Sequence, residues 1–342
     1  MNFLLFATQA YSLAIMRPLQ EAILKRGDNV AWFLYQLDPE LLTPSENILT
    51  TVSEVKNFNP TAVIVPGNWV PDFFPGIKVE IFHGFGIEKK GHLRIRGLFD
   101  LYCTHGTATT EPFTLNAKKY GYFHVIETGW PKVDPLFLQQ SNEKHSSKSS
   151  VNKTILYAPT FSPSLTSAAA LFDQIAKLSK TENYKWIVKF HCKMDQESID
   201  KYQKLAGENL HVSDSEDILH LLQIADIMIT DTSSVISEFL LLDKPVITYN
   251  NRFPEGHTLD FNNPELLPGL IKQAISNPEA VLQQGQQFIN KIHPYRDGKS
   301  SERVLQAVDT FIATYQSKLK KKPLNLFRRL QTRKRLSYFK LR

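Results

Sequence analysis

Short apolar runs alternate with amphipathic stretches along this chain, and this alternation constrains the fold more than any other feature. Residues 12–26 have the spacing of an amphipathic helix, closed by Gly27. The apolar runs of the first third that read as strands are residues 3–8, 30–35, 62–66 and 78–82. Because strands that alternate with helices form parallel sheets covered on both faces, the pattern predicts an α/β fold.

A polar, serine-rich segment at residues 141–153 lacks periodicity, and the alternation restarts after it. Strands are expected at residues 154–158, 185–190, 211–212, 227–230 and 245–249. Helices are expected at residues 168–180, 196–205, 218–223 and 233–242. We therefore expect two Rossmann-like domains, 1–140 and 154–312, which face each other across a cleft and are joined by a linker at 141–153. Ligands of such folds bind beyond the carboxyl ends of the strands.

Composition narrows the class of protein. A length of 342 residues with 42% hydrophobic residues suits two domains. The two cysteines, Cys103 and Cys192, exclude a disulfide framework and favour a reducing compartment. The first charged residue is Arg17, so the amino-terminal apolar run lacks the basic start of a signal peptide, and no run is long enough to span a bilayer. We expect a cytoplasmic protein that is soluble or peripheral to the membrane.

The net charge of +6 is unevenly distributed. Eleven of the 40 Lys and Arg residues lie in residues 313–342, which contain no Asp or Glu. The remainder of the chain carries 29 basic against 34 acidic residues, a balance of −5. The basic character therefore belongs to one tail, which is not typical of a protein that binds nucleic acid with its whole surface.

The basic tail, residues 313–342, predicts an amphipathic helix that starts at Pro323. Its apolar side comprises Leu324, Leu326, Phe327, Leu330, Tyr338 and Leu341. We expect it to contact an anionic membrane surface at the inner face of the cell membrane. The basic residues assigned to this contact are Lys320, Lys321, Lys322, Arg328, Arg329 and Arg333. The alternatives are a terminal helix packed on the first domain, a disordered tail, or RNA binding, for which stacking aromatic positions are sparse.

The sharpest motif is residues 229–239, where a β-branched strand runs into a polar loop and then a helix. Free backbone N–H groups, a helix start and hydroxyls suit the binding of phosphate. Glu238, four residues after Ser234, is a candidate acceptor for ribose hydroxyls. The alternative is plain capping of the helix by Thr232 or Ser233. The candidate phosphate-binding residues are Asp231, Thr232, Ser233 and Ser234.

Two histidines follow predicted strands. His83 and Gly84 end one strand in the first half. Such a histidine can act as a general base, and Gly84 would allow the donor to approach the backbone closely, although a capped turn is the favoured explanation for the pair taken alone. His191, flanked by Lys189 and Lys193, ends a strand in the second half. An imidazolium there could stabilise a leaving pyrophosphate oxygen.

Smaller signals complete the candidate site. Thr160 closes a strand that faces the expected cleft, and Arg303 could reach a phosphate from its helix. Pairing of Arg303 with Glu302 or Asp297 is the alternative. Cys192 and His191 lack further ligands at metal spacing, so no metal site is expected. Walker, dinucleotide-binding, zincin and nucleophile-elbow motifs are absent from the sequence.

Taken in order, seven short pieces resemble the CDP-glycerol glycerophosphotransferase family, the teichoic-acid primases and polymerases. They are His83-Gly84, Thr128-Gly129-Trp130-Pro131-Lys132-Val133-Asp134, Tyr157-Ala158-Pro159-Thr160-Phe161, Lys189-Phe190-His191, Ser213-Asp214-Ser215-Glu216-Asp217-Ile218, Ile229-Thr230-Asp231-Thr232-Ser233-Ser234 and Asp297-Gly298-Lys299-Ser300-Ser301-Glu302-Arg303.

The resemblance implies a GT-B fold, with neither a cofactor nor a bound catalytic metal. It implies that His83 deprotonates the acceptor hydroxyl of a glycan or lipid-linked precursor and that His191 binds the pyrophosphate of a CDP-alditol donor. Asp231, Thr232, Ser233 and Ser234 would bind the donor phosphates. The acceptor oxygen would then attack the β-phosphorus in line and expel CMP.

The sequence departs from the resembled pattern at three places: Phe85-Gly86 replaces Thr-Pro, Ser162 replaces Arg, and Cys192 replaces Pro. The long extra domain of the polymerases is also missing, which favours a single or limited transfer. Two alternatives remain at this point. The first is a transferase or epimerase of the same fold that acts on a nucleotide sugar. The second is a non-catalytic, membrane-tethered binding module.

Overall fold

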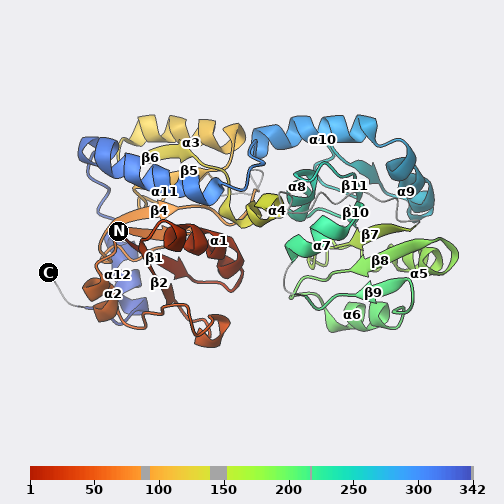
Figure 1. Cartoon of the computed structure of the whole chain (residues 1–342), viewed down its shortest axis with the longest axis horizontal. Coiled ribbons are helices and arrows are strands. Elements are labelled where there is room, and N and C mark those ends of the chain that lie inside the picture. Colours follow the sequence, from red (N-terminus) through yellow and green to blue (C-terminus); the bar gives the residue numbers. More distant parts are fainter. Residues whose placement is uncertain (86–92, 139–151, 216–217, 340–342) are drawn as a thin grey trace. The chain divides into compact units, whose positions relative to one another are not determined.

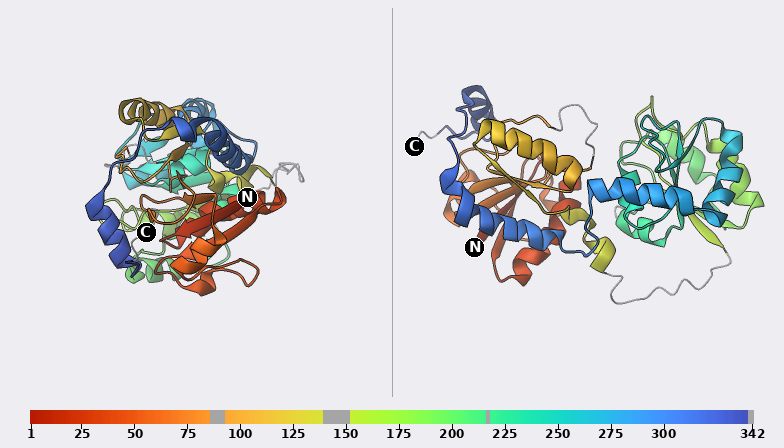
Figure 2. Two further views of the ribbon diagram at one scale, coloured as in Figure 1. Left: turned by 90° about the vertical axis from the view of Figure 1, so that its left-hand side faces the viewer. Right: turned by 90° about the horizontal axis from the view of Figure 1, so that it is seen from above.

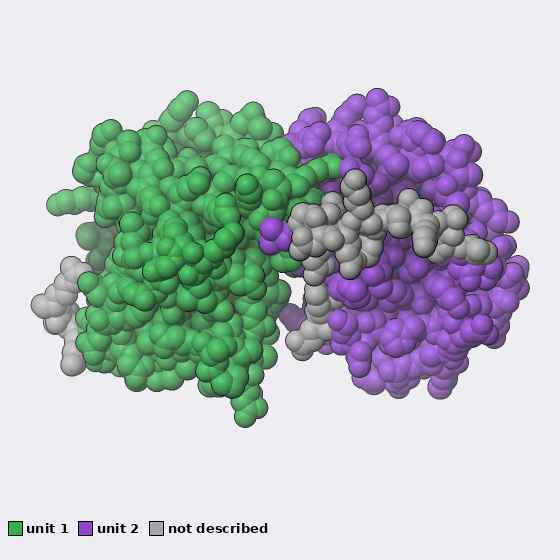
Figure 3. Space-filling view, in the orientation of Figure 1, with its two compact units in different colours: residues 1–137, 292–342 green, residues 138–291 purple. Residues whose placement is uncertain are grey.

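The computed structural model describes residues 1–85, 93–138, 152–215 and 218–339. The chain divides into two compact units (Figure 3). Unit 1 comprises Met1–Phe137 and Ile292–Arg342, and unit 2 comprises Leu138–Lys291. Most of the expected linker, residues 141–151, lies outside the described residues.

Unit 1 is built on a six-stranded parallel sheet with the strand order β2-β1-β3-β4-β5-β6. β1 and β3 are apolar on both faces, as a sheet covered on both sides requires, and residues 3–7 are fully buried. The strands are β1 (Asn2–Ala7), β2 (Asn29–Leu34), β3 (Ala62–Val65), β4 (Ile77–Glu80), β5 (Leu101–Thr104) and β6 (His124–Glu127).

Helices cover both faces of this sheet (Figure 2). α2 (Val52–Phe58) and α3 (Thr107–Tyr120) pack on one face, whereas α1 (Tyr11–Lys25) and α11 (Ser300–Thr310) pack together on the other. α2 begins with a capping box in which Thr51 and Glu54 satisfy each other's backbone N–H groups. The remaining helical segments of this unit are η1 (Pro39–Leu41), η2 (Pro131–Val133), α4 (Pro135–Leu138), η5 (Phe311–Tyr315), η6 (Gln316–Lys318) and α12 (Leu326–Arg335).

Unit 2 holds a second six-stranded parallel sheet, with the order β12-β11-β10-β7-β8-β9. Its strands are β7 (Lys153–Tyr157), β8 (Tyr184–Val188), β9 (Leu210–Val212), β10 (Ile227–Thr230), β11 (Val246–Tyr249) and β12 (Leu259–Phe261). The helices are α5 (Phe172–Thr181), α6 (Gln196–Gln203), α7 (Ile218–Ile224), α8 (Val235–Leu240), η4 (Pro264–Leu266), α9 (Leu267–Ser276) and α10 (Glu279–Ile292). Side chains of α5, α6 and α9 form one apolar core with this sheet.

The strands and helices expected from periodicity are present, with shifts at their ends. The helix expected from residue 168 begins at Phe172, after a turn in which the Leu171 N–H donates to the Ser167 carbonyl. The helix expected at residues 233–242 is only Val235–Leu240. Three short strands had no sequence signal strong enough to predict them, namely β5, β6 and β12.

The chain returns to unit 1 after α10, so the domain end expected at residue 312 differs from the observed division. α11 buries Val304, Val308 and other apolar residues in unit 1. Its first backbone N–H groups, those of Ser300 and Ser301, donate to the buried Asp134 carboxylate at 2.8 and 2.7 Å. This carboxylate caps the helix and ties it to the loop after β6.

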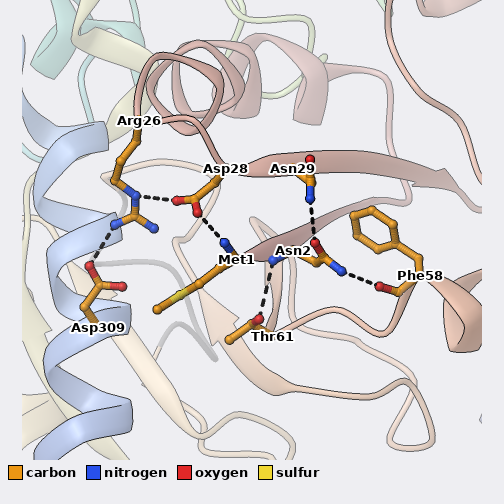
Figure 4. Close-up of polar contacts among 8 residues, drawn as sticks. All are labelled: Met1, Asn2, Arg26, Asp28, Asn29, Phe58, Thr61 and Asp309. Atoms are coloured by element: carbon orange, nitrogen blue, oxygen red, sulfur yellow. Dashed lines mark hydrogen bonds and ion pairs between the residues drawn. The ribbon is translucent and has the colours of Figure 1, made fainter.

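The start of β1 is held by polar contacts from three neighbouring segments (Figure 4). The Met1 amino group contacts Asp28, whose neighbour Arg26 donates to Asp309 of α11 at 2.8 Å. The Asn2 amide donates to the Phe58 carbonyl at 2.6 Å and accepts from Asn29 at 3.0 Å. These contacts join β1, β2, α11 and the end of α2.

The basic tail packs on unit 1. This arrangement corresponds to the alternative of a terminal helix packed on the first domain. Lys322 is half-buried and its ammonium group donates to Asp100 at 2.7 Å, so this side chain is engaged within unit 1 and its contact with a membrane is not supported. The Asn325 amide binds the Arg96 carbonyl at 3.1 Å, and the Trp69 indole donates to Thr332 at 2.9 Å. Among the described residues, no helix combines the length and apolar character needed to cross a membrane.

The tail helix is shorter than expected. It runs from Leu326 to Arg335, between Asn325 and Ser337, which both have a positive φ (48° and 49°). Tyr338 therefore leaves the helical pattern and stacks on Phe73 of unit 1, with ring centroids 4.7 Å apart. Tyr338 was wrongly grouped with the apolar side of the helix, since a turn after Arg335 redirects it.

The Asp134 cap gives a stability prediction. Asp134→Ala leaves two buried N–H groups without an acceptor, so the free energy of unfolding of unit 1 should fall by about 2 kcal/mol or more. Asp195→Ala, which removes the exposed cap of α6, is the matched control and should cost about 1 kcal/mol or less. Urea unfolding followed by circular dichroism measures both. An equal loss in the two variants would contradict the assigned role of Asp134.

Candidate active site

The predicted site residues of unit 2 gather at the carboxyl edge of its sheet (Figure 1). β10 lies between β7 and β11, so the loops that follow these three strands are neighbours. These loops carry Thr160, residues 231–234 and Arg252, and β8 next to β7 leads to His191. The parallel topology therefore brings together residues that are far apart in the sequence.

Asp231 holds this edge together from inside. Its side chain is fully buried, and its carboxylate accepts the Thr160 N–H at 3.0 Å, the Ser167 N–H at 2.9 Å and the Ser167 hydroxyl at 3.0 Å. Burial raises the pKa of Asp231, and the bonds from Ser167 and Thr160 oppose that rise. The structure thus gives Asp231 a structural role and not the predicted phosphate contact, because its oxygens are filled by protein donors and a carboxylate repels phosphate.

The three hydroxyls after Asp231 differ in their surroundings. The Thr232 hydroxyl accepts the Arg252 N–H at 3.0 Å, and the Ser233 hydroxyl accepts the Val235 N–H at 3.4 Å. Ser234 is exposed and makes no capping bond to α8. The capping alternative therefore holds for Ser233 alone, while Ser234 presents its hydroxyl to solvent.

An open pocket of about 470 Å³ lies beside this loop. It is lined by Asn250, Asn251, Arg252, Asp260, Phe261, Asn262, Leu266 and Leu270. Glu238, the predicted ribose acceptor, is on α8 and only 5% exposed. Its contact with a ribose stays a prediction.

His191 is exposed at the end of the β8 segment, and its ring lies on Phe161 with centroids 4.4 Å apart. Its Nδ1 accepts the Lys193 N–H at 3.1 Å, so the proton of the neutral ring is on Nε2. Burial and the charges of Lys193 and Lys189 lower the pKa of His191. The ring is therefore neutral at pH 7 without ligand, and its Nε2–H, not a permanent imidazolium charge, is the group available to a phosphate oxygen.

Metal ligands do not cluster in the described ranges. Within residues 1–85, 93–138, 152–215 and 218–339, no group of three or more His, Cys, Asp or Glu side chains could hold a metal ion. The Cys192 sulfur lies 3.7 Å from His191 Nδ1, which already accepts a backbone N–H.

The predicted base, His83, is in unit 1, three residues after β4. It is exposed, and the ring of Tyr11 lies 6.0 Å from its own. A side chain added at Gly84 would meet no atom within 4 Å, so the protein itself does not require glycine there. Gly86, with the following Lys89 and Lys90, lies outside the described residues.

Arg303, a predicted donor-binding residue, is engaged within unit 1. Its two terminal nitrogens donate to the Asp297 carboxylate at 2.8 and 2.9 Å, and its Nε donates to the Thr128 carbonyl at 2.8 Å. The guanidinium also lies 3.9 Å above the Tyr295 ring. The alternative of pairing with Asp297 is confirmed. Three of the five guanidinium N–H groups are thus used within its own unit, and the contact of Arg303 with a donor phosphate stays a prediction.

Several residues that build the site were missed. Phe161, Ser167 and Arg252 touch the predicted residues of unit 2, and His293 accepts the Trp130 N–H in unit 1 at 2.9 Å. Phe161 ends the motif of residues 157–161, which is the sequence signal that could have identified it. No sequence signal marks His293, whose role depends on a partner 163 positions away.

Residues 93–310 match the sequence profile of the CDP-glycerol:poly(glycerophosphate) glycerophosphotransferase family. The chain belongs to this family. The match includes all the unit 2 residues described above. His83 lies before it, so its role as the base rests on the resemblance and on its position alone.

Relatives of this chain include teichoic acid polymerases and primases. The chain is 29% identical over 223 residues to a teichoic acid ribitol-phosphate polymerase of Staphylococcus aureus, a match of 58% of this chain and 39% of that protein. It is 28% identical over 205 residues to a teichoic acid glycerol-phosphate primase of Bacillus subtilis, with 55% and 52% covered. The chain thus spans about half the length of these relatives or less.

Solved structures confirm the fold. The wall teichoic acid polymerase TagF superposes with a TM-score of 0.67 at 16% identity, over 91% of this chain and 89% of that one. A UDP-N-acetylglucosamine 2-epimerase superposes with a TM-score of 0.63 at 15% identity, over 94% and 98%. The two-Rossmann-domain, GT-B class of α/β fold predicted from the sequence is therefore confirmed.

The surroundings of His191 predict its titration. Because burial and two lysines disfavour its charged form, nuclear magnetic resonance should give a midpoint below about 6.5, the ordinary value for histidine. Lys193→Gln removes a like charge and should raise that midpoint. Lys201→Gln, which removes an exposed lysine of α6, should leave it unchanged. A midpoint that does not respond to Lys193→Gln would contradict this account.

Proposed function

We propose that this protein transfers glycerol phosphate, or a related alditol phosphate, from a CDP-activated donor to a hydroxyl of a cell-surface glycan or lipid-linked precursor, with release of CMP. The observation that carries the proposal is membership of the glycerophosphotransferase family over residues 93–310. The edge of the unit 2 sheet supports it, since this edge combines His191, Thr160 and exposed hydroxyls within the matched range.

On the donor side, we expect neutral hydrogen-bond donors to hold the pyrophosphate. The His191 Nε2–H and the Ser234 hydroxyl are the exposed groups suited to this task, and Thr232 and Ser233 add hydroxyls beside them. Lys189 and Lys193 supply positive charge close by. A bound phosphate would raise the pKa of His191 and strengthen its hydrogen bond, as charge-assisted bonds are the stronger ones.

On the acceptor side, His83 accepts the proton of the attacking hydroxyl. The acceptor oxygen forms a bond to the β-phosphorus while the bond from that phosphorus to the bridging oxygen breaks. The electron pair of the broken bond stays on CMP, and the proton passes from His83 to solvent. In this proposal the reaction needs no resident cofactor or metal, so turnover should persist in a chelator.

The test is CMP release by the purified protein. We expect turnover of CDP-glycerol or CDP-ribitol by slow transfer to water, with a fall of about 10²-fold or more in His83→Ala, the size expected for loss of a general base. His191→Ala should weaken donor binding as well as turnover. His211→Ala, which changes an exposed histidine, is the matched control, and its CMP release should equal that of the wild type.

Donor choice separates the proposal from its alternatives. If neither CDP-alditol is turned over but a nucleotide sugar is, the sugar-transferase or epimerase alternative would replace the proposed glycerophosphotransferase activity. Donor binding without turnover, together with cellular function that survives both histidine variants, would indicate a non-catalytic binding module.

We also propose that the docked tail contacts an anionic membrane surface at the inner face of the cell membrane. Three side chains of α12, Leu326, Phe327 and Leu330, are 64%, 73% and 63% exposed. The opposite side of the tail is bound to unit 1 through Thr332 and Tyr338. A soluble surface rarely exposes adjacent large apolar side chains beside many basic residues, whereas membrane-surface helices do so.

The basic residues around these exposed apolar side chains differ from the set expected from the sequence. Lys320 and Lys321 are exposed and remain in the proposal, and Lys334 and Arg335 join them. Arg328, Arg329 and Arg333 are half-buried, with Arg329 3.6 Å from Asp72 and Arg333 over the Phe73 ring. Each basic residue near anionic headgroups contributes about 1 kcal/mol, so the exposed ones suffice for salt-sensitive binding.

Substitution tests this surface better than deletion, because removing the tail would also expose the core of unit 1. The triple variant Leu326→Ser, Phe327→Ser, Leu330→Ser should abolish co-sedimentation with vesicles that contain phosphatidylglycerol. The control carries Leu115→Ser and Leu266→Ser, which are 66% and 53% exposed elsewhere, and should bind normally. Equal binding by both variants, or equal binding to nucleic acid and vesicles, would refute the membrane proposal.

A further inference from the structure

The turn that carries His83 is anchored on both sides by buried aromatic rings. His83 is exposed, whereas Phe82 before it is 3% exposed and Phe85 after it 4%. Phe82 has a φ of 58°, a conformation that side chains with a Cβ adopt rarely and only when their surroundings enforce it. The direction in which His83 leaves the sheet therefore depends on what holds Phe82 and Phe85.

Trp130 supplies one of these restraints. Its indole Nε1–H donates to the Phe82 carbonyl at 3.3 Å, across 48 positions of sequence. Trp130 is 2% exposed, so no water replaces that bond readily. The bond fixes the peptide between Phe82 and His83, the unit whose orientation sets the position of the histidine.

Phe85 is held by a cage of three rings. The centroid of its ring lies 4.8 Å from Trp130, 5.2 Å from His105 and 5.6 Å from His293, each in an edge-to-face arrangement. Such arrangements are the preferred geometry of aromatic pairs. The same Trp130 that bonds to Phe82 therefore also packs against Phe85.

His293 holds Trp130 in turn. Its Nε2 accepts the Trp130 backbone N–H at 2.9 Å, which requires that nitrogen to be unprotonated. Burial, the largest cause, lowers the pKa of His293 to about 4, so this acceptor persists at neutral pH. Gly129 makes the approach possible, because a Cβ there would lie 2.9 Å from His293 Nε2 and 2.5 Å from the Ser300 hydroxyl.

We propose that Trp130 and His293 are positioning residues that hold the His83 turn in the orientation needed for proton transfer. The proposal rests on the proposed function, in which His83 is the base. It adds a chain of contacts that runs from His293 through the Trp130 backbone and indole to the Phe82 carbonyl. Neither residue touches the reacting atoms.

The first test is Trp130→Phe, which keeps an aromatic ring in the cage and removes the N–H. We expect kcat to fall by about ten- to a hundredfold, since a displaced base loses part of its contribution, while KM for the CDP-alditol donor stays within about twofold. Trp32→Phe removes another buried indole N–H of unit 1, the one that binds Gln20, and should leave kcat unchanged. An equal fall in both variants would mean that only general stability is affected.

The second test uses rescue at His293. His293→Leu removes the acceptor and should lower kcat about as much as Trp130→Phe, whereas His293→Gln can present an amide oxygen at similar reach and should recover most of it. The acid limb of the kcat/KM profile should also shift in His293→Leu, because His83 changes its surroundings. Failure of glutamine to restore activity in a protein that unfolds at the wild-type temperature would overturn the role of this bond.

A third readout does not depend on turnover. In protein with labelled histidine, the His83 resonance is assigned by its loss in His83→Gln, and its chemical shift and titration midpoint are compared in the variants. We expect both to change in Trp130→Phe and not in Trp32→Phe. If His83→Ala proves fully active, the base in the proposed function is wrong, yet this comparison still decides whether Trp130 positions His83. Identical His83 resonances in all variants would overturn the proposal.

Discussion

A single buried carboxylate, that of Asp231, joins the loops at the carboxyl edge of the unit 2 sheet. It accepts donors from Thr160 and Ser167, and so binds the loop after β7 and the segment before α5 to the loop after β10. A carboxylate without solvent is tolerated only when its oxygens are matched by donors in this way. The positions of the adjacent hydroxyls and of Phe161, on which His191 lies, follow from that network.

Unit 1 uses the same principle with different groups. The Asp134 carboxylate caps α11, Arg303 bonds Thr128 to Asp297, and His293 accepts the Trp130 N–H. The Asp134, Thr128 and Trp130 contacts join the loop after β6 to the segment that returns from unit 2, and the Asp297 bond orients Arg303 within that segment. The segments 128–134 and 297–303 are thus bound to each other by polar contacts within unit 1, and Trp130 of the first segment also donates to the Phe82 carbonyl next to His83.

In the tail, docking on unit 1 and the proposed membrane contact draw on the same side chains. Lys322, Thr332 and Tyr338 bind unit 1, whereas Leu326, Phe327 and other apolar residues stay exposed. A helix with one docked side has fewer residues available to a membrane than its composition suggests. It also presents them in a fixed orientation, which a disordered basic segment of equal charge would not.

The sequence by itself determined the two parallel sheets, the strand ends that carry His83 and His191, and the family, because periodicity and short motifs are local properties of the chain. It could not assign the roles of Asp231, Arg303 and Lys322. A carboxylate, guanidinium or ammonium group has the same local signature whether it meets a ligand, a membrane or a distant part of its own chain. The tertiary structure decided these roles, since burial and the donors and acceptors brought close by folding determine which partner such a group binds.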